Sequence, residues 1–154
     1  MMFLEVTDLD GDGHMDILAT TRNGKLLFFR RTEDSPAGWQ THDIPLPWGY
    51  HFGKSVRAGD IDLDGKSDLV LANRSGGNGA APSRKSNVAW LHYEQKPTEA
   101  NWRAEEISGR EGEKFDLMEL VDLDGDGDLD VLTCEERENL GVVWYENPTW
   151  KGKP

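Results

Sequence analysis

The sequence repeats one acidic pattern, Asp-x-Asp-x-Asp-Gly-x-x-Asp, as DLDGDGHMD at residues 8–16, DIDLDGKSD at 60–68 and DLDGDGDLD at 122–130. Each copy places four carboxylates within nine residues, where they repel one another unless a cation lies among them. A hard ion with six to eight oxygen ligands, Ca²⁺ before Mg²⁺, suits these donors. The glycine at position six allows a sharp turn around the ion. The alternative is an acidic solvated turn, which three copies in matching register disfavour. We therefore expect about three structural calcium sites.

The flanking residues distinguish these loops from EF-hands, which begin in the same way. An EF-hand loop closes with a bidentate Glu at position twelve, but here that position holds Ala19, Leu71 and Thr133. The neighbouring segments are short apolar runs, FLEV before the first copy and ILAT, LVLA and VLTC after the three copies. Such runs are typical of strands rather than of amphipathic helices. Each loop is therefore predicted to join two antiparallel strands.

More of the chain repeats than the loop alone. The copies begin 52 residues apart (60 − 8) and then 62 residues apart (122 − 60). An aromatic strand is predicted after each loop, at 25–31, 88–94 and 142–147. In the first two units a Trp with an Ile five residues later follows, which indicates a fourth strand.

Units of four short antiparallel strands at this spacing match the blade of a β-propeller. We predict an all-β chain, a β-propeller segment of about three four-stranded antiparallel blades that forms an incomplete ring. The third unit ends after its third strand. The whole chain, residues 1–154, is expected to be a single domain with units at about 2–48, 53–110 and 115–150.

The acidic loop between two strands resembles the FG-GAP/VCBS-type repeat, which is also found in the calcium-binding blades of integrin α-subunit propellers. The resemblance covers nearly the whole chain. It implies calcium in the hairpin between the first and second strand of each blade, held by positions one, three, five and nine and by the backbone carbonyl of position seven. The implied metal residues are Asp8, Asp10, Asp12, His14, Asp16, Asp60, Asp62, Asp64, Lys66, Asp68, Asp122, Asp124, Asp126, Asp128 and Asp130.

The connections opposite the acidic loops are predicted to crowd one rim of the molecule. Aromatic side chains beside charged ones suit a sugar or another polar ligand. For the aromatic candidates the alternative is packing between blades, and Glu135 and Glu136, adjacent on a strand, point to opposite sides and form no evident acid–base pair. The candidate ligand-binding residues are Trp48, Tyr50, His51, Arg74, Glu135 and Arg137. We interpret the recurring Trp39, Trp90, Trp102 and Trp144 as blade packing.

Two functions from different classes follow from this pattern. The first is a non-enzymatic, calcium-stabilised propeller module that binds a glycan or a protein. The alternative is part of a carbohydrate-active enzyme of the lyase or dehydratase type, in which the rim would act with His51, Glu135 or Arg137. No Ser/His/Asp arrangement, phosphate loop or zinc motif supports the enzyme, and a fold alone does not decide between them.

The composition of the chain limits the ligands and the cellular location that we expect. The net charge of −12 equals the number of loop aspartates at positions one, three, five and nine, so it indicates metal binding rather than nucleic-acid binding. No run approaches transmembrane length, the segment MMFLEVTD is not a signal peptide, and the single Cys134 allows no intrachain disulfide. Weak calcium loops suit calcium near millimolar concentration, so we expect an extracellular or periplasmic location. Exposed blade edges lead us to expect pairing with the rest of a longer propeller, or self-association, to close the ring.

Overall fold

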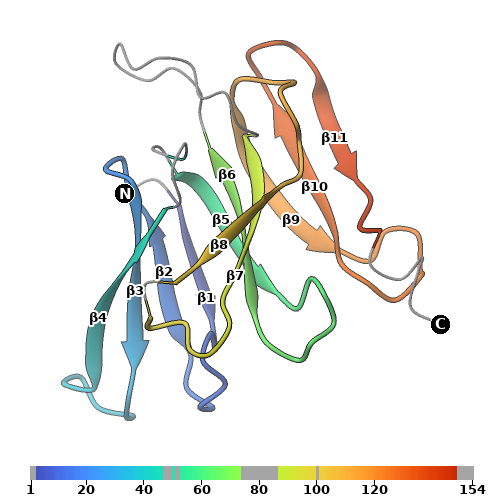
Figure 1. Cartoon of the computed structure of the whole chain (residues 1–154). Coiled ribbons are helices and arrows are strands. Elements are labelled where there is room, and N and C mark those ends of the chain that lie inside the picture. The colour runs from blue at the N-terminus through green and yellow to red at the C-terminus, as the bar shows by residue number, and fades with distance from the viewer. Residues whose placement is uncertain (1–2, 47–49, 51–52, 74–86, 100, 149–154) are drawn as a thin grey trace.

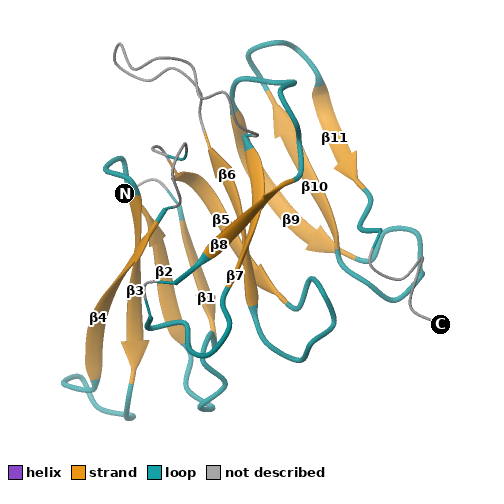
Figure 2. Cartoon of the chain, in the orientation of Figure 1, coloured by secondary structure: helices purple, strands orange, loops and turns teal. Residues whose placement is uncertain are grey.

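The computed structural model describes residues 3–46, 50, 53–73, 87–99 and 101–148. In these residues the chain forms eleven strands and no helix, arranged as three antiparallel sheets (Figure 1, Figure 2). The described residues include no helix long and apolar enough to cross a membrane. The predicted all-β architecture of open, successive blades is confirmed.

Each sheet corresponds to one predicted repeat unit, and its strands lie in chain order. Blade one contains β1 (Leu4–Thr7), β2 (Asp16–Thr20), β3 (Lys25–Arg31) and β4 (Trp39–Pro45). Blade two contains β5 (Gly53–Gly59), β6 (Asp68–Asn73), β7 (Val88–His92) and β8 (Arg103–Glu106). Blade three contains β9 (Phe115–Val121), β10 (Asp130–Glu135) and β11 (Gly141–Tyr145), so it has three strands among the described residues.

The three blades share one register, which makes their residues directly comparable. The ninth loop residue opens the second strand of every sheet, and the next residue pairs with the third strand as Ile17↔Phe29, Leu69↔Leu91 and Val131↔Tyr145. Side chains alternate along a strand, so each blade has two faces. We call the face that carries these paired residues the backward face, and the opposite one the forward face.

The core forms where the forward face of one blade meets the backward face of the next. Between blades one and two, the buried side chains are Leu18, Leu26, Phe28 and Ile44 against Leu69, Leu71, Ala89 and Leu91. Between blades two and three, they are Val70, Ala72 and Val88 against Phe115, Met118 and Val131. Removing this apolar surface from water is the main driving force for stacking, at about 25 cal/mol per Å².

The recurring tryptophans differ in burial according to the blade that covers them. Trp102 is 7 % exposed and belongs to the core between blades one and two, and Trp90 is partly buried against the second core. Trp39 and Trp144 are exposed, by 39 % and 45 %, so neither packs between two described blades. By register, Trp39 lies on the backward face of blade one and Trp144 on the forward face of blade three. No described blade covers either face.

Candidate metal sites

The three acidic loops occupy the same place in the three blades. Each connects the first strand to the second, β1 to β2, β5 to β6 and β9 to β10, so all three lie at one end of the sheets (Figure 1). We call them loop one (8–16), loop two (60–68) and loop three (122–130). The predicted placement of these loops in antiparallel hairpins is therefore confirmed.

The carboxylate at position one organises the backbone of each loop. In loop one, Asp8 accepts hydrogen bonds from the backbone N–H groups of Gly11 at 2.9 Å and Gly13 at 2.8 Å. In loop three, Asp122 accepts the corresponding bonds from Gly125 and Gly127. The position-six glycines have φ values of +90° in loop one, +87° in loop two and +98° in loop three, which side chains with a Cβ rarely adopt.

The carboxylate at position nine is deeply buried in every loop. Asp16, Asp68 and Asp130 are 0 %, 3 % and 1 % exposed. One oxygen of each accepts the backbone N–H of the second loop residue, for example Leu9 at 3.0 Å from Asp16. The other oxygen of Asp16 accepts the N–H of Arg31 at 2.7 Å, which ties the loop to the third strand of its blade.

Burial also changes the pKa of Asp16 and of Asp68. Burial raises the pKa of Asp16, although two backbone hydrogen bonds act in the opposite direction. Burial likewise raises the pKa of Asp68 to about 6, and the nearby charge of Asp62 adds to the effect. Each raised pKa shows that the protein stabilises the ionised carboxylate only incompletely. A cation bound beside the carboxylate would provide the missing stabilisation.

Three carboxylates converge in each loop. One oxygen from each member of the set lies within 4.8 Å of the others. The converging ligands are all oxygens, which suits a hard cation such as Ca²⁺. In loop one, the Oδ1 atom of Asp10 is buried and has no hydrogen-bond partner among the described residues, so it is an acceptor that an ion would satisfy. The sets are Asp8, Asp10 and Asp16; Asp60, Asp62 and Asp68; and Asp122, Asp124 and Asp126.

In loops one and two, the side chain at position seven pairs with a carboxylate. The Nδ1 atom of His14 lies 3.6 Å from Asp34. The ammonium of Lys66 lies 2.7 Å from Asp64, and this hydrogen bond lowers the pKa of Asp64. Asp128 is 1 % exposed.

The cations that pair with the loop carboxylates distinguish the three loops. The guanidinium of Arg30, on β3, forms ion pairs with both Asp10 and Asp12, the latter at 2.7 Å. In loop two, Lys66 pairs with Asp64. In loop three, Asp122, Asp124 and Asp126 form no ion pair with a described residue. Loop three is therefore the least neutralised by the protein itself.

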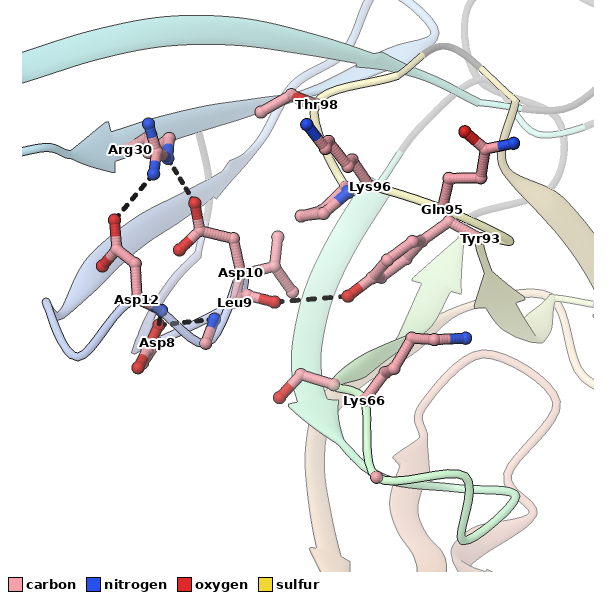
Figure 3. Close-up of a pocket in the computed structure, with 14 residues that line it drawn as sticks. Asp8, Leu9, Asp10, Asp12, Arg30, Lys66, Tyr93, Gln95, Lys96 and Thr98 are labelled. Carbon is pink, nitrogen blue, oxygen red and sulfur yellow. Dashed lines mark hydrogen bonds and ion pairs between the residues drawn. The ribbon is translucent and has the colours of Figure 1, made fainter.

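A polar cavity of about 510 Å³ lies beside loop one, between blades one and two. Figure 3 shows Arg30 bridging Asp10 and Asp12 on one side and the ring of Tyr93 pointing toward Leu9. The Tyr93 hydroxyl donates to the carbonyl of Leu9 at 3.5 Å. The motif could not reveal this cavity, because its wall is assembled from two different repeats. The lining residues are Asp8–Asp12, Arg30, Gly65–Ser67, Tyr93 and Gln95–Thr98.

The predicted rim opposite the loops is placed only in part. Tyr50 is 1 % exposed and packs in the core between blades one and two, and its burial raises the pKa of its hydroxyl to about 12. Arg137 forms an ion pair with Glu113 at 2.9 Å. Trp48, His51 and Arg74 lie outside the described residues. Of the described rim candidates, Tyr50 is thus a core residue and Arg137 is paired within the protein.

The side chain of Glu135, the remaining rim candidate, binds backbone N–H groups. It closes β10 and is 2 % exposed. Its two oxygens accept hydrogen bonds from five backbone N–H groups at 2.8 to 3.4 Å. The donors belong to Glu113, Lys114, Arg137, Glu138 and Leu140. Glu135 thus joins the segment before β9 to the turn between β10 and β11.

Comparison with known families agrees with this geometry. Residues 8–71 match the model of the FG-GAP-like repeat, a stretch that begins at loop one and ends within β6. Loop three lies beyond the matched residues but has the same strand register and glycine conformation. No curated protein and no solved structure gives a significant match to the chain.

Proposed function

We propose that the chain, of which residues 8–71 match the FG-GAP-like repeat, is a calcium-binding, non-enzymatic propeller module that presents a binding surface in an exported protein. The observation that carries the proposal is the convergence of three carboxylates in every one of the three loops. A bound Ca²⁺ supplies positive charge and oxygen coordination at the centre of each loop. The protein supplies the preorganised carboxylates and the backbone turn that presents them.

The proposed role of calcium is structural. In each loop the position-nine carboxylate already connects the start of the hairpin to the body of the blade. An ion that binds this arrangement and not the unfolded chain adds its binding free energy to the stability of the fold. The proposed exported location follows from the same chemistry, since weak calcium loops fill where calcium is near millimolar.

For ligand binding, we favour the cavity beside loop one over the rim that the sequence indicated. The cavity places carboxylates and Arg30 of blade one opposite Lys66 and Lys96 of blade two, which suits a polar ligand such as a glycan or an acidic protein segment. At the rim, Tyr50 is in the core and Glu135 is held by backbone donors. The enzymatic alternative would need a catalytic group there, and no contact of the described rim residues favours it.

Replacing Asp124 with Ala tests the metal sites. We expect the Asp124→Ala variant to bind one calcium ion fewer per chain, because loop three loses one of its three converging carboxylates. Calorimetric titration with calcium measures the stoichiometry. Asp43→Ala is the matched control, since Asp43 lies on β4, is 54 % exposed and pairs with Lys25. An unchanged number of ions in Asp124→Ala would refute the assignment of loop three.

Replacing Arg30 with Gln should strengthen calcium binding at loop one. The guanidinium competes with an ion for Asp10 and Asp12, so its removal is expected to raise the affinity of that site roughly tenfold, the effect of about 1.4 kcal/mol of relieved charge repulsion. Competition against a calcium-sensitive dye measures the affinity. Lys25→Gln removes a cation that pairs with Asp43 instead and should leave the affinity unchanged. Equal affinity in Arg30→Gln and Lys25→Gln would contradict the competition.

A further inference from the structure

The forward face of blade three exposes apolar side chains that are buried at equivalent positions elsewhere. Val142 is 75 % exposed, whereas its equivalents by register, Leu26 and Val88, are 0 % exposed. Leu123, the second residue of loop three, is 48 % exposed, whereas Leu9 and Ile61 are 1 % and 6 % exposed. In blades one and two this face is covered by the following blade. Leu117, Leu123, Val142 and Trp144 therefore form an unfilled stacking face.

A polar contact repeats at both existing blade junctions. The Tyr93 hydroxyl of blade two donates to the carbonyl of Leu9 in blade one at 3.5 Å, and the Asn147 amide of blade three donates to the carbonyl of Ile61 in blade two at 2.8 Å. Tyr93 and Asn147 are equivalent residues, each two positions beyond the paired residue of the third strand. At the next junction the corresponding acceptor is the carbonyl of Leu123.

Charges alternate along the first strands of the blades. The residues at one equivalent position of these strands are Glu5, Arg57 and Glu119. They directly precede Val6, Ala58 and Leu120, which pair with equivalent residues of the second strands. The guanidinium of Arg57 lies 3.1 Å from Glu5 and 3.4 Å from Glu119. Glu119 remains 57 % exposed, whereas Glu5 is 22 % exposed. The next residue in this series should therefore be a cation.

We propose that the forward face of blade three binds a further FG-GAP-like blade with Arg or Lys at the position equivalent to Arg57 and a hydrogen-bond donor at the position equivalent to Asn147. The proposal rests on the repeated geometry of blade stacking and not on calcium binding. A second copy of this chain offers apolar Leu4 and Val6, which are 55 % and 51 % exposed on its blade one. It would, however, place its Glu5 against Glu119, and like charges in contact oppose association.

Removing the charge of Glu119 tests the proposal on the whole chain. With calcium present, we expect Glu119→Gln to self-associate head to tail at least about tenfold more tightly than the unmodified chain in sedimentation velocity, since the repulsion at the junction is gone. Glu94→Gln is the matched control, because Glu94 is equally exposed, at 57 %, and also pairs with an arginine, Arg103. Adding Val142→Glu to Glu119→Gln should abolish the association, because it places a charge in the apolar face.

Each other outcome overturns the proposal. A stable dimer of the unmodified chain would show that a second copy, rather than a blade with a cation, fits the face. Equal association of Glu119→Gln and Glu94→Gln would remove the charge argument. Association that survives Val142→Glu would place the contact elsewhere, and a Glu119→Gln variant that stays monomeric would show that the face does not bind a blade. Circular dichroism of each variant confirms that its sheets are formed.

Discussion

Removal of calcium is expected to lower the melting temperature of the chain by more than about 10 °C. A site held at a thousand times its Kd contributes about 4 kcal/mol to the free energy of unfolding. For a domain of this size, 1 kcal/mol corresponds to roughly 2–4 °C. Three such loops together therefore have a large effect, because their carboxylates repel one another when the ion is absent. Calorimetric melting with excess calcium and with a chelator measures the difference.

Magnesium provides the control for this experiment. Mg²⁺ demands near-ideal octahedral geometry and gives up its water reluctantly, so it should restore less stability than Ca²⁺ at the same concentration. Added monovalent salt screens the carboxylates without coordinating them and should give a smaller increase. Equal melting temperatures with calcium and with chelator would contradict a structural role for the ion.

Replacing Glu135 with Gln is expected to lower the free energy of unfolding by about 2–4 kcal/mol. A glutamine offers one acceptor oxygen where the carboxylate offers two, so backbone donors among the five that Glu135 holds lose their partner in a buried site. A buried donor without a partner costs about 1–3 kcal/mol. Urea denaturation of both proteins at neutral pH measures the difference. Glu136→Gln is the control, because this neighbouring carboxylate is 54 % exposed and its substitution should have little effect.

The same substitution should change the dependence of stability on pH. Burial acts to raise the pKa of Glu135, but the backbone hydrogen bonds outweigh it, so the pKa lies below the ordinary value of 4.5. A depressed pKa means that this stabilisation is present above pH 4.5 and is lost as the pH falls through the folded-state value. The gap between the native chain and Glu135→Gln should therefore narrow under acid. A gap that is constant from neutral pH to pH 3 would contradict this assignment.

The sequence predicted the loops and strands well because their causes are local. The spacing of Asp and Gly determines where the chain turns, and the apolar runs beside each loop become the first and second strands. The positive φ at the position-six glycines, such as Gly13, follows from the same pattern. The repeated spacing also predicted the same order of strands in each unit.

Burial and charge pairing could not be read in the same way, because they depend on neighbouring blades and distant strands. Tyr50 looked like a rim aromatic but is buried between two blades, whereas Trp144 recurs like a core residue but lies on an uncovered face. Arg30 reaches loop one from β3, about twenty residues away along the chain. Its repeat equivalents are His92 and Glu146, so alignment of the three units was the only available signal that loop one differs.

Calorimetric titration of the calcium-stripped chain with Ca²⁺ tests the central claim most directly. We expect about three ions bound per chain, one for each group of converging carboxylates. The tightest of these sites should be the one that is lost in Asp124→Ala, which assigns it to loop three. The absence of calcium binding, or a stoichiometry unrelated to the three loops, would contradict it.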